Sequence, residues 1–385
     1  MRLILFLGAG VSIPSGLPDA RALTKRILKG PPHATGDGDR VRVLLDVLRK
    51  HDTNDISRVG AVSDGSASGA IYRGTSTYED LFFLCQQIAL WNIGLSDNSM
   101  TTPFMEVIER KARTLLRGRT VAARLRDLAS MGRLGCSLIE TIVSGTLQRK
   151  YRAGFDLIRQ LATDRRVDQL NIVTLNHDTL VEQFLSANKL PFIDGFGGRD
   201  GDVRWYEDDV YDAPGARIRL FKLHGSIDWY SFLYGGRSRT AIFLGRDPTR
   251  AKDQGLKPLM VEFGRPSFLS GVNKAVAYQR GLFADIHFHF GELLRRCDRI
   301  LMSGYGWGDT IVNFQLDTWF DRVRSNRLLL LHRHSNELRN NSLIMASGYD
   351  AWVQSGQLVC IARWLCEASL GHVEEYLFAG PQEAP

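Results

Sequence analysis

Three short polar segments carry the residue types that could do chemistry in this chain. Residues 176–178 read Asn-His-Asp, residues 224–226 read His-Gly-Ser, and residues 304–309 read Gly-Tyr-Gly-Trp-Gly-Asp. An Asn amide can both donate and accept hydrogen bonds toward sugar hydroxyls, and a His imidazole takes up or releases a proton near neutral pH. Asn176 and His224 are therefore the candidates for holding a hydroxylated substrate and for moving a proton.

A glycine-rich turn near the start of the chain is a fourth candidate segment. Leu3 to Leu7 form an unbroken apolar run, which is typical of a strand buried on both faces. Gly-Ala-Gly follows at residues 8–10, and helical spacing begins soon after it. A strand, a glycine-rich turn and a helix start together predict a site for the phosphates of a nucleotide. Position 13 is Ile rather than the third glycine of the dinucleotide fingerprint, so a tight turn without a ligand is the alternative.

Composition narrows the class of protein. The chain has 385 residues, of which 44% are hydrophobic and 24% are charged, as in a soluble globular protein. No apolar run reaches the length of a membrane span, and no secretory signal pattern is present, so we expect a cytoplasmic protein without membrane contact. The five cysteines are scattered and form no C-x-x-C pair, which supports neither a zinc site nor a disulfide framework.

The positive charge is spread along the chain. The net charge is +7, with mild arginine-rich groupings at 110–126 and 295–299 and no basic tail. We favour a solvated surface and leave nucleic-acid binding open. No paired-carboxylate motif that would hold catalytic Mg²⁺ is evident, so a nuclease is the least favoured class. His287 and His289 are read as packing or surface residues rather than as a metal pair.

Apolar runs alternate with helical patterns through most of the chain. This alternation predicts an α/β fold with a doubly wound, mostly parallel, Rossmann-like sheet and an inserted helical module between residues 78 and 160. Ligands of such sheets lie beyond the carboxyl ends of the strands. The polar segments follow expected strands directly, so we expect them to converge on one site. The expected strands are 3–7, 170–175, 218–223, 299–303, 328–332 and, at one edge, 358–362.

Four motifs taken together resemble the sirtuin family. They are LFLGAGVSIPSGLPDAR, NIVTLNHD, KLHGSIDW and SGYGWGD, and their order and separations agree with that family. The likeness is strongest to bacterial sirtuin-like domains with T-x-N-x-D and K-L-H-G-S motifs, many of which are NAD hydrolases in antiphage defence. The resemblance covers roughly residues 1–30 and 165–335. It implies a Rossmann-type NAD domain over residues 1–335 with a helical insertion at about 31–165, followed by a mixed segment at 336–385 that packs on it or mediates assembly.

The resemblance also implies a role for individual residues. Asn176 and Asp178 would bind the nicotinamide-side ribose and the carboxamide region, next to Thr174 of the same motif, and His224 would be the catalytic base. The remaining residues would bind other parts of the cofactor. Those implied contacts are Gly8, Ala9, Gly10 and Ser12 with the pyrophosphate and its ribose, Asp19 and Arg21 at the nicotinamide side, Ser303 and Gly304 with the adenosine half, and His332 beside the adenine.

Departures from the family pattern indicate which reaction to expect. Deacylating sirtuins carry a zinc module with two cysteine pairs, which this chain lacks. Ala20 stands where those enzymes have a Phe that shields the reacting sugar from water, and Leu175 stands where they have a Gln. The resemblance therefore implies an NAD hydrolase that uses NAD as its substrate, yields nicotinamide and ADP-ribose, and needs no zinc. It would serve as an abortive-infection antiphage effector.

Two other functional classes stay open. One is an NAD-dependent protein deacylase, and the other is a non-catalytic subunit that senses NAD or ADP-ribose within a defence complex. The resemblance further implies a homo-oligomer and, as partner, a HerA-like ATPase or another subunit of a defence complex. These partner expectations rest on family analogy.

Overall fold

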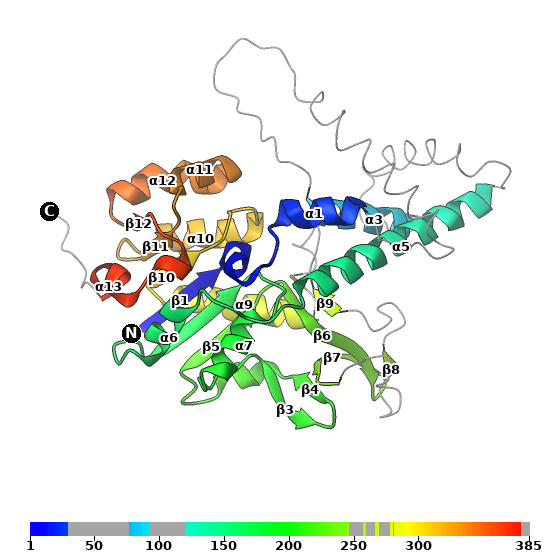
Figure 1. Ribbon diagram of the computed structural model, residues 1–385, viewed down its shortest axis with the longest axis horizontal. Helices are drawn as coiled ribbons and strands as arrows, with labels where there is room; N and C mark the ends of the chain where they lie inside the picture. The colour runs from blue at the N-terminus through cyan, green and yellow to red at the C-terminus, as the bar shows by residue number, and fades with distance from the viewer. Residues whose placement is uncertain are drawn as a thin grey trace, which may run out of the picture. The chain divides into compact units, whose positions relative to one another are not determined.

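The computed structural model describes residues 1–29, 77–91, 121–245, 257–258, 266–268, 278–279 and 281–378 (Figure 1). The chain forms two compact units, which are described separately. Unit 1 comprises Met1–Asp19, Thr146–Leu269 and Ala275–Pro385, and unit 2 comprises Ala20–Gly145 and Ser270–Lys274. Residues 30–76 and 92–120 of the expected helical insertion lie outside the described residues.

Unit 1 is built on a six-stranded sheet in which every neighbouring pair of strands is parallel. Its order is β12-β11-β10-β1-β2-β5. Numbered by first appearance in this sheet, the order is 6-5-4-1-2-3, which is the doubly wound order of Rossmann folds. The predicted fold class is therefore confirmed, including the strand at the edge. The strands are β1 Arg2–Leu7, β2 Gln169–Thr174, β5 Ile218–Lys222, β10 Arg299–Ser303, β11 Arg327–Leu331 and β12 Leu358–Ile361.

Helices cover both faces of this sheet. Leu3 to Leu7 are fully buried, because alternate side chains of β1 enter opposite layers. Ile4 and Phe6 belong to one core cluster with residues of α9 Gly281–Arg296, α10 Thr310–Arg322 and α12 Leu343–Gln354. On the other side, α13 Leu370–Phe378 packs against β11 and α6 Asp156–Thr163. The other described helices of this unit are α7 Leu180–Ala187, α11 Ser335–Leu338 and the 3₁₀ segments Ala9–Ser15, Asp208–Asp212, Arg339–Asn341 and Leu365–Glu367.

The chain order reverses between β1 and β10, which are neighbours in the sheet. A ligand site is expected at such a switch point, beyond the carboxyl ends of the strands. Gly8 follows β1 and Gly304 follows β10 at this position.

A second, antiparallel sheet begins directly after β5. Its order is β3-β4-β7-β6-β8, and β9 pairs with β6. Gly225 has a φ of 81° at the point where the chain leaves β5 and enters β6, a conformation that favours glycine. The sequence has two short strand-like runs in this region, of which residues 241–244 fall largely within β7 and residues 259–263 lie outside the described residues; the other described strands of this sheet were not predicted. Its strands are β3 Phe196–Asp200, β4 Val203–Tyr206, β6 Gly225–Tyr234, β7 Arg237–Phe243, β8 Lys257–Pro258 and β9 Pro266–Phe268.

Unit 2 is helical wherever it is described. It contains α1 Ala20–Lys29, α3 Tyr78–Trp91 and most of α5 Val121–Leu147. The backbones of α3 and α5 approach closely at Gly132, where a Cβ would lie 2.6 Å from Cys85 O. Among the described residues of the whole chain, no helix combines the length and apolar character needed to cross a membrane.

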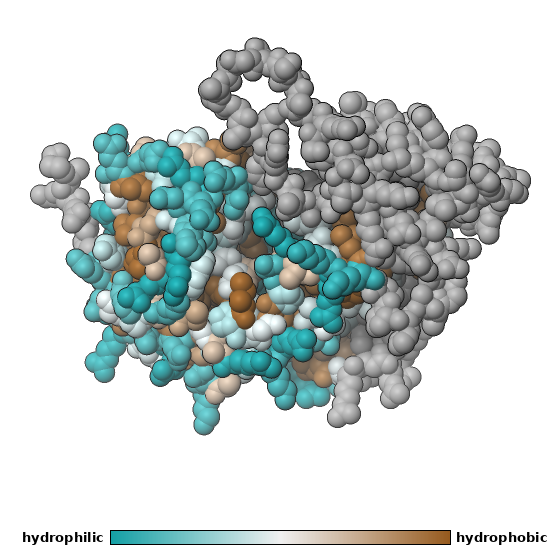
Figure 2. Space-filling view, turned by 45° about the horizontal axis from the view of Figure 1, so that its top comes forward, coloured by the Kyte–Doolittle hydropathy of each residue, from teal (hydrophilic) through white to brown (hydrophobic). Residues whose placement is uncertain are grey.

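Polar residues are frequent on the surface of the described part. Figure 2 shows hydrophilic side chains over much of the face in view, with smaller hydrophobic patches between them. A hydrophilic face is expected both of a solvated surface and of one that binds nucleic acid, so the choice between them stays a prediction.

Candidate functional site at the carboxyl ends of the parallel strands

The carboxyl ends of β10, β1, β2 and β5 are joined by hydrogen bonds. Gly8 N–H donates to Ser303 O over 3.0 Å, which ties the end of β1 to that of β10. Asn176 Nδ2 donates to Gly8 O over 3.1 Å, and Leu223 N–H donates to Thr174 O over 3.0 Å. Segments that are far apart in the sequence are therefore hydrogen-bonded to one another at the carboxyl ends of these strands, as the positions of the motifs predicted.

The glycines of the first turn allow two loops to touch. A Cβ on Gly8 would lie 2.5 Å from both Gly304 O and Tyr305 Cα, and Gly304 itself has a φ of 69°. Gly10 N–H donates to Gly304 O over 3.0 Å. The N–H groups of Gly8 and Gly10 are thus used within the protein, and the small size of both residues serves the packing of these loops. Contact of Gly8, Ala9 and Gly10 with a pyrophosphate stays a prediction.

A buried network surrounds Asn176. Its Nδ2 donates to Gly8 O and, over 3.1 Å, to Ser12 Oγ, which uses both amide protons. Ser12 Oγ donates in turn to Asp178 Oδ2 over 2.8 Å, while Asp178 Oδ1 accepts from Leu180 N–H near the start of α7. Because Gly8 O can only accept, the orientation of the amide is fixed. Within the described residues no hydrogen bond reaches Asn176 Oδ1, so this oxygen can accept from a ligand hydroxyl.

His224 belongs to a second polar cluster with Asp309 and Tyr278. Its Nε2 lies 3.0 Å from Asp309 Oδ2 and 2.8 Å from Tyr278 Oη. Tyr278 Oη also donates to Asp309 Oδ2 over 2.7 Å, so the three groups contact one another pairwise. The side chains of His224 and Asp309 are only 4% and 7% exposed. A buried imidazole held by a carboxylate is the arrangement of a positioned general base.

Asp309 lies in a segment that the sequence places at the site, but no role was predicted for it, and Tyr278 was not predicted at all. Asp309 ends the turn before α10, and its Oδ1 accepts from Ile311 N–H and Val312 N–H as a helix N-cap. An Asp at that position is fully explained by capping, so its second role carried no separate signal. Tyr278 is 54 residues from His224 and follows no expected strand, so only the fold brings it to the site.

The ring of His287 packs against the ring of Tyr278. The two rings are stacked with their centroids 3.8 Å apart, and His287 Nε2 lies 3.3 Å from Leu223 O. Burial, with a further contribution from nearby His224, lowers the pKa of His287 to about 4, so its imidazole is neutral at physiological pH. His289 lies on the same helix and contacts Tyr211 instead. Among the described residues no cluster of three or more His, Cys, Asp or Glu side chains could hold a metal ion.

Lys222 supports the loop after β2 from the neighbouring strand. Its Nζ donates to Asp178 O and, over 2.7 Å, to Glu182 Oε1. Burial would lower the pKa of Lys222, but Glu182, Asp228 and Asp178 outweigh burial and raise it. Burial raises the pKa of Glu182 to about 7, and Lys222 opposes this rise while Asp228 adds to it. The ammonium therefore fixes the backbone of the segment that carries Asn176.

The side chains of Ser303 and His332 make contacts outside these two clusters. Ser303 Oγ donates to Leu331 O over 3.1 Å, between two strands of the sheet. His332 follows β11, two strands from β1, and its ring centroid lies 4.5 Å from that of Trp364. Asp19 is exposed, and Arg21 belongs to unit 2. The predicted roles of these residues stay predictions.

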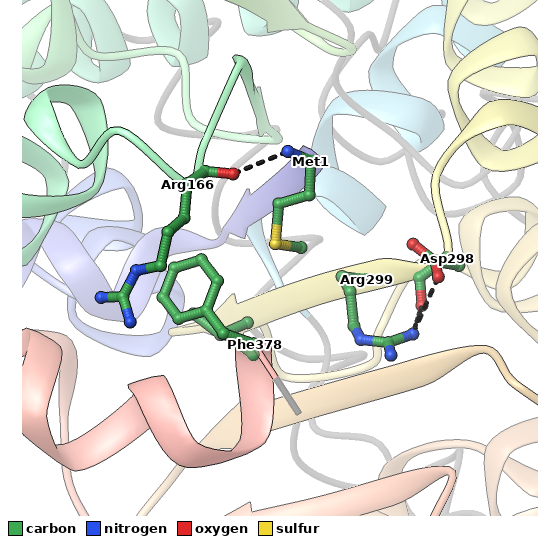
Figure 3. A pocket seen from close by; sticks show the side chains of 6 residues that line it. Met1, Arg166, Asp298, Arg299 and Phe378 are labelled. Atoms are coloured by element: carbon green, nitrogen blue, oxygen red, sulfur yellow. Dashed lines mark hydrogen bonds and ion pairs between the residues drawn. The ribbon is translucent and has the colours of Figure 1, made fainter. Parts of the chain in front are cut away.

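A cavity of about 330 Å³ lies at the amino ends of the parallel strands, opposite the candidate site. It is lined by Met1, Arg166, Asp298, Arg299 and Phe378, among others, where β1 and β10 begin (Figure 3). None of the predicted site residues lines it. We therefore do not associate this cavity with the chemistry of His224 and Asn176.

Comparisons with known proteins place these observations beside solved structures. No protein-family model matches the chain, and no curated protein matches it. A structure described as the structural basis for the mechanism and regulation of Sir2 enzymes is 13% identical, with a TM-score of 0.39, over 97% of this chain and 92% of that chain. A Sir2 mutant with a p53 peptide and NAD is 12% identical, with a TM-score of 0.36, over 98% and 94%. Sir2 with a p53 peptide and NAD⁺ is 13% identical, with a TM-score of 0.34, over 92% and 93%. These are structural similarities to Sir2 enzymes at low identity.

Proposed function

We propose that this protein is an NAD glycohydrolase, which converts NAD and water to nicotinamide, ADP-ribose and a proton. The observation that carries the proposal is the pair of clusters at the switch point of a doubly wound sheet. One cluster presents an amide oxygen on Asn176, and the other holds an imidazole on His224 against Asp309. The sequence motifs that contain these residues supply the expectation that the ligand is NAD.

The reaction needs little from the protein beyond binding and proton transfer. The bond between ribose C1′ and the nicotinamide nitrogen breaks, and the bonding pair leaves with nicotinamide, which departs as a neutral molecule. The sugar passes through an oxocarbenium-like state, as in other glycoside hydrolyses. The oxygen of a water molecule then bonds to C1′, and its released proton passes to the imidazole.

The two clusters divide these tasks. Asn176 Oδ1 accepts from a hydroxyl of the nicotinamide-side ribose, since its amide protons are already used by Gly8 and Ser12. His224 takes the proton, and Asp309 and Tyr278 fix its ring. Burial of both clusters limits the access of bulk water, which strengthens hydrogen bonds at the reacting sugar.

NAD consumption by the purified full-length chain tests this function. The wild type is incubated with NAD alone and with NAD plus an acetyl-lysine peptide, beside His224→Ala and Asn176→Ala. His372→Ala and Asn188→Ala are matched controls at exposed positions of unit 1. We expect NAD loss without peptide, abolished only in the two site variants. Loss that requires the peptide would replace the proposal with deacylation, and equal loss in His224→Ala would refute this site.

The defence role is a separate part of the proposal and rests on the sequence motifs alone. An enzyme that destroys NAD harms its own cell, so its activity must be restrained until infection. We therefore propose an abortive-infection effector that assembles with itself and with a HerA-like ATPase or another defence subunit. A chain that stays a monomer and keeps the same NADase rate when that ATPase is added would contradict this part.

A further inference from the structure

The contact between His224 and Asp309 joins distant parts of the sheet. His224 follows β5 and Asp309 follows β10, and β1 and β2 lie between these strands. Neighbouring strands are about 4.8 Å apart, so β5 and β10 are separated by roughly 14 Å. The connection formed by residues 304–309 and the side chain of His224 therefore bridges the ends of β1 and β2. We call residues 304–309 the bridging segment.

Hydrogen bonds within the bridging segment and to Asn313 fix its conformation. Asp309 N–H donates to Tyr305 Oη over 3.1 Å, and Tyr305 Oη lies 2.8 Å from Asn313 Oδ1. Asn313 Nδ2 donates to Trp307 O over 2.8 Å. Trp307 is 1% exposed and has a φ of 57°, a left-handed conformation that is unfavourable for a bulky residue. Such strain persists only where the surrounding structure fixes the backbone, so the carboxylate of Asp309 has a defined position.

The two oxygens of this carboxylate have different partners. Oδ1 caps α10, whereas Oδ2 accepts from Tyr278 Oη and contacts His224 Nε2. An ionised carboxylate can only accept hydrogen bonds. The proton of a neutral His224 must then be on Nε2, which leaves the lone pair on Nδ1.

We propose that Asp309 is a positioning residue for His224: its Oδ2 keeps the proton on Nε2 and so makes Nδ1 the nitrogen that acts as base. This inference rests on the proposed function for its catalytic consequence, but the protonation pattern of His224 does not depend on that function. Tyr278, stacked on His287, completes the pocket for Nε2 and keeps the ring from rotating.

Asp309→Asn separates positioning from capping. Asn is as good an N-cap as Asp, so its Oδ1 still accepts from the start of α10. Its NH₂ group replaces Oδ2 and can only donate, which forces the lone pair of His224 onto Nε2. An analogous change in a Ser-His-Asp triad lowers kcat by about 10⁴-fold through the wrong tautomer. We expect kcat for NAD to fall by about 10³-fold or more, with a small change in KM.

The test combines kinetics, stability and ¹⁵N NMR of histidine-labelled protein. The spectrum of His224→Ala assigns the His224 signals, and Asp321→Asn on the same helix is the matched control. We expect the wild type to show the lone pair on Nδ1, Asp309→Asn to show it on Nε2, and both variants to keep the wild-type thermal midpoint. A wild-type lone pair on Nε2, or an unchanged tautomer in Asp309→Asn, overturns the inference. A wild type without NADase activity would refute the proposed function, whereas the NMR result would still decide the role of Asp309.

Discussion

Gly8→Ala is expected to force apart the two loops that meet at the switch point. The new Cβ would lie 2.5 Å from Gly304 O and from Tyr305 Cα, and 2.7 Å from Tyr305 N. All three are backbone atoms, which cannot turn away as a flexible side chain can. The bridging segment would have to shift by several tenths of an ångström, and the hydrogen bond from Gly8 N–H to Ser303 O would lengthen.

The expected loss of stability follows from this overlap. Overpacking in a tight interior typically costs about 1–3 kcal/mol, and contact with three rigid atoms places Gly8→Ala at about 3 kcal/mol. An unfolding entropy of about 2 cal/mol/K per residue gives roughly 0.8 kcal/mol/K for 385 residues. The midpoint of thermal unfolding should therefore fall by about 4 °C.

Gly306→Ala is the matched control within the bridging segment. No atom lies within 4 Å of a Cβ at this position. Its stability should stay within about 0.5 kcal/mol of the wild type. Thermal unfolding and urea titration of the three proteins measure the difference. Equal stability of Gly8→Ala and the wild type, or equal losses in both variants, would refute the argument that loop packing requires glycine at position 8.

Three further predictions concern buried polar groups. Burial raises the pKa of Glu182 from 4.5 to about 7, so the folded chain binds a proton at a higher pH than the unfolded chain does. The free energy of unfolding should therefore rise as pH falls through this range, and urea unfolding of Glu182→Gln should lack that rise. Burial lowers the pKa of His287 from 6.5 to about 4, so the wild type loses stability as pH falls between these values, and His287→Gln should not. For each variant, a stability curve parallel to that of the wild type from pH 7.5 to pH 4 would contradict the prediction. Ser12→Ala should lower the free energy of unfolding by about 1–3 kcal/mol, because Asn176 loses a buried hydrogen-bond partner. Ser347→Ala, at an exposed site, should change it little. Similar losses in both variants would contradict a stabilising network around Asn176.

The parallel sheet could be predicted because its strands are mostly apolar. Leu3 to Leu7 have no polar break, and the strand that ends at Thr174 has one internal polar residue, the buried Asn171. The antiparallel sheet gave a weaker signal. Ile227 and Trp229 alternate with Asp228 and Tyr230 in β6, but this alternation directly follows the His-Gly-Ser motif, which was predicted as the polar segment after the strand 218–223.

The candidate site was predictable only in part. Asn176 and His224 follow strands, so the rule for carboxyl ends found them. Asp309 serves two partners with one carboxylate, and capping alone accounts for its position in the sequence. Tyr278 reaches the site from a segment with no strand or motif of its own. Gly8 was predicted to contact a pyrophosphate, which stays a prediction, whereas its close approach to the backbone of Gly304 is seen only in the folded chain.

Hydrolysis of NAD in ¹⁸O-labelled water tests the central claim most directly. The purified wild type and His224→Ala are incubated with NAD, and nicotinamide and ADP-ribose are quantified by mass spectrometry. We predict one nicotinamide and one ADP-ribose per NAD consumed by the wild type, one ¹⁸O atom in each ADP-ribose, and no turnover in His224→Ala. Intact NAD with the wild type, or unlabelled and cyclised product, would contradict the account.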